Sequence, residues 1–176
     1  VARAVARQPQ IILFDEPITN VDVEAKVQLK RALKGLVKQH SQTIIYVTHD
    51  QTEAMTLADE IALMNVGKII QRGTPRELYN NPNNRFGGWF LGNPGMNFVE
   101  HDVGQQGGQA VLGAPLFRQP VVADGLNGDQ VVVVGVRPER VQIGAQTPTS
   151  VEGEVIRTSI VVGGQHLVTV RVGNVM

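Results

Sequence analysis

The segment IILFDEP, residues 11–17, decides the fold prediction for this 176-residue chain. Four apolar residues end abruptly in two carboxylates, Asp15 and Glu16, and the polar segments TNVD (19–22) and VTHD (47–50) follow further on. A continuous apolar run of this length favours a strand that is buried on both faces of a parallel sheet, and ligands bind at the carboxyl ends of such strands. The segment therefore predicts an α/β fold with a site at the strand end.

The neighbouring sequence supports this interpretation. Residues 1–7 have the pattern of the end of a helix, and residues 23–39 carry apolar side chains at helical spacing behind an acidic first turn. Residues 43–48 are β-branched and apolar, which predicts a second buried strand ending at His49. A strand, a helix and a second strand in this order predict a parallel pair.

Local signals predict further short elements. Asp50 followed by Glu53 has the spacing of a capping box, so we expect a short helix through Ala58. Residues 61–64 and 69–71 flank a turn at 65–68 and predict a hairpin. The sequence TPRE at 74–77 then supplies an N-cap, a proline at the first helical position and a capping-box glutamate for another helix.

Composition changes near Leu91. Five of the nineteen glycines precede this residue and fourteen follow it. Turn-forming residues at 92–95 mark the linker that we predict at this change. Beyond it, short β-branched runs broken by glycine predict a small all-β domain, a barrel or a sandwich, with runs at 110–112, 131–136, 155–156, 160–162 and 167–172.

Charge and composition exclude several classes of protein. Sixteen basic residues balance sixteen acidic ones, and no basic run is interleaved with aromatic residues, so nucleic acid is not the expected partner. The absence of cysteine excludes disulfides, thiolate metal sites and thiol nucleophiles. No apolar run approaches the roughly 20 residues that a membrane helix needs.

The carboxylates and the histidine suit phosphoryl transfer to water. That reaction needs an acidic group for Mg²⁺, a base that orients the attacking water and donors for the γ-phosphate. Asp15 and Glu16 could supply the first two. The pair alone is weak evidence, because it could simply end a strand, but Pro17, the TNVD turn and His49 after the next strand make a purely structural explanation poor.

With these motifs the chain resembles the ATP-binding subunit of ABC transporters. Residues 11–16 match the Walker B strand, and the resemblance implies that Asp15 holds the Mg²⁺ shell and that Glu16 is the catalytic base. The segment at 19–22 resembles the D-loop, which is usually Ser-Asn-Leu-Asp, and places Asp22 among the nucleotide-site residues. His49 matches the switch histidine that contacts the γ-phosphate.

The resemblance also extends to the second half. Phe90–Phe98 is similar to the junction in importers of the maltose and glycerol-phosphate type, and the VRPE segment at 136–139 matches a turn of their regulatory domain. The implied architecture is part of a P-loop NTPase domain with a parallel sheet at 1–92, followed by an all-β, OB-like (TOBE) domain at 96–176. The implied function is ATP hydrolysis, with ATP and Mg²⁺, to energise uptake of a sugar or glycerol-phosphate-like solute.

The same resemblance implies a second ATPase subunit, transmembrane permease subunits and, indirectly, a solute-binding protein as partners, at the cytoplasmic face of the cell membrane. The phosphate loop, Gly-x-x-x-x-Gly-Lys-Ser/Thr, is absent from the 176 residues, as is the Leu-Ser-Gly-Gly-Gln signature. We therefore expect a C-terminal fragment that by itself neither binds ATP tightly nor hydrolyses it. Without backbone amides and a lysine around the phosphates, Asp15 and Glu16 would repel a negative ligand.

Two other functions remain open at this point. The β domain could bind a regulator or small ligand without nucleotide, as a non-enzymatic module or remnant. An OB-type nucleic-acid binder ranks lower, because Phe98 and Phe117 are the only aromatic residues after Phe90 and the charge is balanced.

Overall fold

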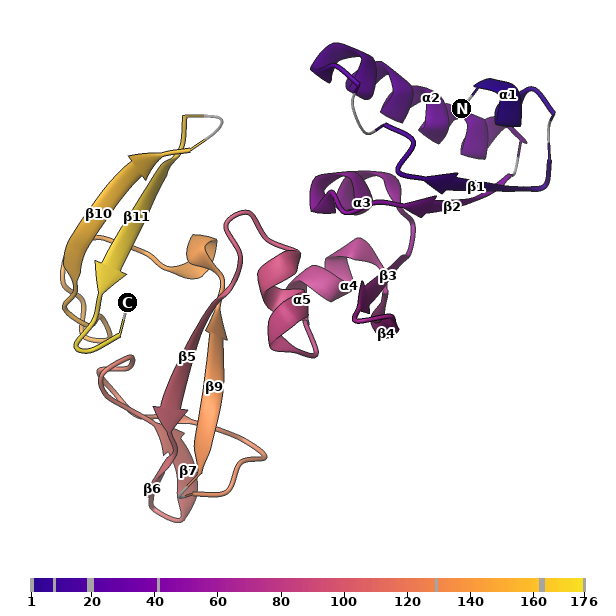
Figure 1. Ribbon diagram of the computed structural model, residues 1–176. Helices are drawn as coiled ribbons and strands as arrows, with labels where there is room; N and C mark the ends of the chain where they lie inside the picture. The colour runs from indigo at the N-terminus through magenta and orange to yellow at the C-terminus, as the bar shows by residue number, and fades with distance from the viewer. Residues whose placement is uncertain are drawn as a thin grey trace. The chain divides into compact units, whose positions relative to one another are not determined.

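The computed structural model describes residues 2–7, 9–18, 21–40, 42–128, 130–161 and 164–175. The chain divides into two compact units, unit 1 (Val1–Gly95) and unit 2 (Met96–Met176) (Figure 1). Unit 1 contains helices and strands, in the order α1 (Ala2–Val5), β1 (Ile11–Asp15), α2 (Val23–His40), β2 (Thr43–Val47), α3 (Gln51–Leu57), β3 (Ile61–Asn65), β4 (Lys68–Gly73), α4 (Pro75–Asn80) and α5 (Arg85–Phe90).

The predicted parallel pair is confirmed. β1 and β2 pair in parallel with Asp15 opposite Val47, and α2 is the crossover between them. One face of the pair carries a core of Ile12, Phe14 and Leu33, against which Leu29, Ile44 and Tyr46 pack. Leu29 and Leu33 of α2 face the strands, as the amphipathic pattern of this helix predicts.

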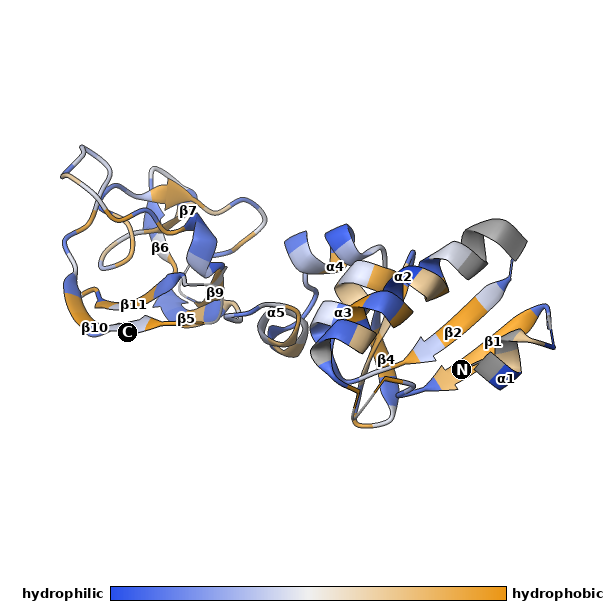
Figure 2. Cartoon of the chain, turned by 90° about the horizontal axis from the view of Figure 1, so that it is seen from above, coloured by the Kyte–Doolittle hydropathy of each residue, from blue (hydrophilic) through white to orange (hydrophobic). Residues whose placement is uncertain are grey.

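The prediction that the first strand is buried on both faces is wrong. Burial alternates along β1, and Ile11 and Leu13 are 62% and 67% exposed. Ile45 and Val47 of β2 are also about half exposed. Because the helices of unit 1 bury only the Ile12 and Phe14 side, the described part of the chain leaves an apolar face at the opposite side of the pair; Figure 2 shows the hydrophobic colouring of β1 and β2.

The predicted hairpin and helix that follow are also confirmed. β3 and β4 pair antiparallel around Val66 and Gly67, whose φ angles of 47° and 72° suit a type I′ turn. Thr74 caps α4 in a full capping box with Glu77. Helix α5 was not predicted, because Gly87 and Gly88 are poor helix formers. Gly87 nevertheless allows close packing, since a Cβ there would lie 3.2 Å from Leu63 Cδ2.

A second core holds this part of unit 1 together. Its buried members come from β3, α4 and the end of α5, and partly buried side chains of α3 pack on them. They are Ile61, Leu63, Leu78 and Leu91, contacted by Ala54, Met55, Ala58, Ile70, Phe86 and Phe90.

Unit 2 is built from strands, as predicted. They are β5 (Asn97–Asp102), β6 (Gly104–Gln106), β7 (Gln109–Leu112), β8 (Val121–Val122), β9 (Val131–Val136), β10 (Glu154–Ile160) and β11 (His166–Arg171), with one 3₁₀ turn, η1 (Pro138–Arg140). The runs expected at 155–156 and 160–162 form one strand up to Ile160, and Val162 lies outside the described residues.

The strands of unit 2 form small antiparallel sheets. The pairings are β5 with β9, β10 with β11, and β6–β7–β8. Among the described residues these pairings do not link into one closed barrel. The chain as a whole is therefore a mixed α/β protein with mostly antiparallel small sheets.

Candidate functional site

Three of the four predicted site residues, Asp15, Glu16 and His49, lie where β1 and β2 end. The parallel register sets Asp15 beside Val47, and the backbone N–H of Glu16 donates to the carbonyl oxygen of Val47 at 2.9 Å. This last backbone bond extends the pairing one residue beyond β1. It brings the residues after the two strands to the same edge, although they are more than thirty positions apart in the chain.

Glu16 and His49 contact each other at this edge. His49 Nδ1 lies 2.7 Å from Glu16 Oε1, and the two side chains are 73% and 42% exposed. Glu16 has a φ of 43°, in the left-handed region that a residue with a Cβ adopts only at a cost. The chain therefore turns sharply at Glu16 and directs its carboxylate to His49 rather than continuing the strand.

The pair alters the protonation of the histidine. The hydrogen bond to the Glu16 carboxylate, followed by its negative charge, raises the pKa of His49 above its ordinary value. A protonated imidazole has N–H donors on both ring nitrogens. With Nδ1 facing Glu16, the protonated form would offer Nε2–H to an anionic ligand.

Asp15 is exposed at the end of β1. In phosphoryl-transfer sites Mg²⁺ is bound by one or two carboxylates plus the phosphate oxygens of the substrate and water. In the part of the chain that the structure describes, no three His, Cys, Asp or Glu side chains gather as a metal site. A single exposed carboxylate at the strand end fits an ion that takes its other ligands from phosphate and water.

Asp22 lies at the start of α2 and caps it. Its Oδ1 accepts the backbone N–H of Ala25 at 2.9 Å, and its carbonyl oxygen accepts that of Lys26. Thr19 and Asn20, the first half of the D-loop-like segment, lie outside the described residues. The structure thus brings Glu16 and His49 into contact. The hydrogen bonds of Asp22 are to backbone N–H groups of its own helix, α2.

Sequence reasoning assigned the wrong partners to Glu53. Asp50 caps α3 as predicted and accepts from Thr52 and Glu53, but the reciprocal bond of a capping box is not made. The Glu53 side chain instead turns inward and is only 4% exposed. It accepts hydrogen bonds from Tyr46 and Thr48, and Lys30 Nζ lies 3.8 Å from its other oxygen.

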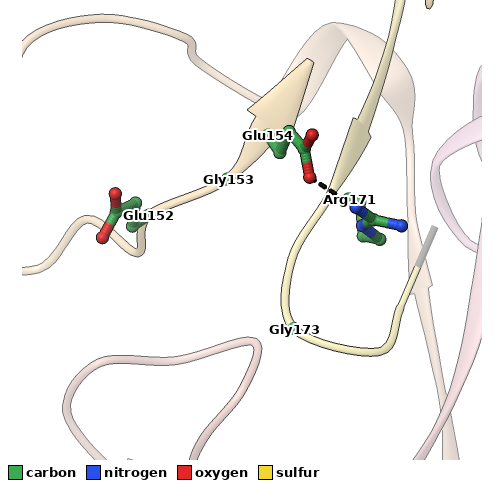
Figure 3. Close-up of a pocket in the computed structure, with 5 residues that line it drawn as sticks. All are labelled: Glu152, Gly153, Glu154, Arg171 and Gly173. Carbon is green, nitrogen blue, oxygen red and sulfur yellow. Dashed lines mark hydrogen bonds and ion pairs between the residues drawn. The ribbon is translucent and has the colours of Figure 1, made fainter. Parts of the chain in front are cut away.

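Unit 2 has an open polar depression of about 310 Å³ on its surface. It is lined by Glu152, Gly153, Glu154, Arg171 and Gly173, and Arg171 forms an ion pair with Glu154 across β10 and β11 (Figure 3). It was not predicted from the sequence, because it depends on the antiparallel pairing that sets Glu154 opposite Arg171. Within the described residues, no helix is both long and apolar enough to cross a membrane.

No family model matches the chain. Three relatives do. The uncharacterized ABC transporter ATP-binding protein y4oS of Sinorhizobium fredii is 40% identical over 96% of this chain and 47% of its own length. The sn-glycerol-3-phosphate import ATP-binding protein UgpC of Psychromonas ingrahamii is 41% identical over 89% of this chain and 41% of its own length. The maltose/maltodextrin import ATP-binding protein MalK of Mannheimia succiniciproducens is 39% identical over 87% of this chain and 43% of its own length. The chain thus spans less than half the length of these relatives.

Proposed function

We propose that this chain, which belongs to the family of ABC transporter ATP-binding proteins, carries the hydrolytic side of the ATP site of a solute importer. The observation that carries the proposal is the 2.7 Å contact between His49 and Glu16 at the ends of two adjacent parallel strands. The names of the relatives favour a sugar or a glycerol-phosphate-like compound as the solute.

In this proposal Glu16 is the base. Its carboxylate is half exposed at the strand end, so it is open to an attacking water and accepts that water's proton. His49 faces the γ-phosphate. Because Glu16 raises the pKa of His49, the imidazole is more often protonated and can donate to a phosphate oxygen while Nδ1 remains on Glu16.

Asp15 would hold Mg²⁺, which neutralises charge on the phosphate oxygens when it is bound. Asp22 would contribute to the nucleotide site from the start of α2, next to the D-loop-like segment. The phosphate-binding amides and lysine are not among the 176 residues. We therefore propose that the isolated chain neither binds ATP tightly nor hydrolyses it, and saturable micromolar binding of ATP by the purified chain would contradict this.

The proposed architecture follows the same family. Residues 1–92 would be the C-terminal part of a P-loop NTPase domain, which the parallel β1–β2 pair supports, and residues 96–176 an OB-like TOBE regulatory domain. The proposed partners are a second ATPase subunit, the membrane permease subunits and, through them, a solute-binding protein. This assembly would place the chain at the cytoplasmic face of the membrane.

A chimera tests the catalytic assignment. This chain would replace the matching C-terminal part of the maltose/maltodextrin import protein of Mannheimia succiniciproducens, and ATP turnover would be measured. We expect turnover in the chimera, and bound but unhydrolysed ATP after Glu16→Gln. Glu24→Gln, an exposed carboxylate in the first turn of α2, is the matched control and should hydrolyse normally. Normal turnover with Glu16→Gln would remove Glu16 from the base role.

A second candidate function is binding of a small solute without nucleotide at the polar depression of unit 2. Carboxylates of Glu152 and Glu154 are acceptors for hydroxyl groups, and Arg171 is a donor. Calorimetry of the 176-residue chain with maltose tests it. Binding that Arg171→Gln weakens would support this function, and no heat at millimolar maltose would reject it for that solute.

A further inference from the structure

Among the described residues, Glu53 carries a buried carboxylate that has no role in the proposed hydrolysis. It is 4% exposed, whereas the side chain of His49 is 73% exposed. Buried carboxylates are retained where they are paired and fully hydrogen-bonded. Here the partners come from α2, β2 and the turn after β2, so one side chain joins three parts of unit 1.

The hydrogen bonds around Glu53 have a fixed direction. The hydroxyl groups of Tyr46 and Thr48 donate to Glu53 Oε2 at 2.9 and 3.0 Å. An ionised carboxylate can only accept, so the single hydroxyl proton of Thr48 must point to Glu53. The Thr48 oxygen is then available as an acceptor, and it accepts the backbone N–H of Asp50 at 3.0 Å.

These bonds fix the backbone on both sides of His49. Val47 is held by the N–H of Glu16, Thr48 is held by Glu53, and Asp50 is held by Thr48 and by its own cap on α3. His49 itself is mostly exposed, so packing does little to orient its ring. The position of the imidazole therefore depends on this turn and on its contact with Glu16.

We propose that Glu53 is a positioning residue, which holds His49 within hydrogen-bond reach of Glu16 through the hydroxyl group of Thr48. The inference rests on the proposed function for the catalytic meaning of His49, but the geometry that it explains is independent of nucleotide. A shift of about 1 Å in such a group is enough to cost a reaction about 100-fold.

The test is Thr48→Val in the 176-residue chain. This change keeps the β-branched shape, both carboxylates and their charges, and removes only the hydroxyl that links Glu53 to Asp50. Thr52→Val is the matched control, an exposed threonine on the same segment. The readout is the tautomer of His49 in long-range ¹H–¹⁵N spectra at a pH where the ring is neutral, with the exposed His166 as internal reference.

We expect the native chain and Thr52→Val to have the proton of His49 on Nδ1, facing Glu16, with nuclear Overhauser contacts between the two side chains. In Thr48→Val we expect these contacts to be lost and the His49 signals to approach those of His166. If Thr48→Val changed only the stability, the contacts between His49 and Glu16 would remain in the folded protein. Circular dichroism shows whether the variant is folded. An unchanged His49 signature in folded Thr48→Val overturns the proposal.

A second variant keeps the proposal open to refutation if Thr48→Val fails to fold. Glu53→Gln keeps the shape but adds amide donors, so the direction of the Thr48 bond is no longer fixed. We expect the same loss of the His49 signature, and its persistence overturns the proposal. If both variants unfold, Glu53 serves the fold rather than the position of His49, and the proposal is also wrong. None of these spectra involves ATP, so failure of the proposed function in the chimera is a separate result.

Discussion

Replacing Ile61 by alanine should destabilise unit 1 far more than the same change at Ile69. Both isoleucines lie in the β3–β4 hairpin, but Ile61 is 7% exposed in the second core and Ile69 is 63% exposed. Ile61→Ala removes three carbons at about 0.8 kcal/mol each, or about 2.4 kcal/mol, and the cavity left behind brings the expected cost to 2–5 kcal/mol. Ile69→Ala loses only strand propensity, at most about 1 kcal/mol.

Trp89 makes the measurement specific to unit 1. It is the only tryptophan of the chain, and it contacts Phe86 and Phe90, which pack against the same core. With a urea dependence of roughly 2 kcal/mol/M, Ile61→Ala should lower the midpoint of the fluorescence transition by about 1 M or more. Because both changes lose the same strand propensity, their difference isolates burial. Equal midpoints for the two variants would refute the reasoning.

Three further predictions follow from unit 1. Glu16→Gln should lower the pKa of His49 in an NMR titration, because Glu16 is the main cause of its raised value, and an unshifted titration would contradict the pairing. The same pair stabilises the fold at pH values below about 6.5, and this contribution is lost as the pH rises through the raised pKa of His49. Val66→Asn should stabilise the hairpin by about 1 kcal/mol in thermal unfolding, because Val66 has a φ of 47° and is 91% exposed, and an equal or lower midpoint would count against strain there. The purified chain should self-associate through the apolar face formed by Ile11, Leu13, Ile45 and Val47, and Leu13→Ser should reduce the apparent mass in light scattering. A monodisperse native monomer at high concentration would show that this face does not associate.

The residue types of the candidate site stand out in the sequence, but their contacts do not. Asp15, Glu16 and His49 stand out in the sequence because carboxylates and a histidine follow apolar strands. Their spacing does not give the 2.7 Å contact, which arises because β1 and β2 align in parallel with Asp15 opposite Val47. Glu53 shows the opposite case, since its spacing from Asp50 predicted a cap and the structure buries it among side chains from other elements.

By itself the sequence determined the local elements and the family resemblance. Hydrophobic period, turn residues and caps act within a few positions, so the Val66–Gly67 hairpin and the capped helix α4 could be predicted. The parallel pair was predicted from the order of strand, helix and strand along the chain. Only the tertiary structure decided that β1 is buried on one face, that the strands of unit 2 pair in separate small sheets, and that Glu53 points inward. The physical reason is that burial and side-chain partners depend on which distant segments pack together, and a local pattern carries no information on that choice.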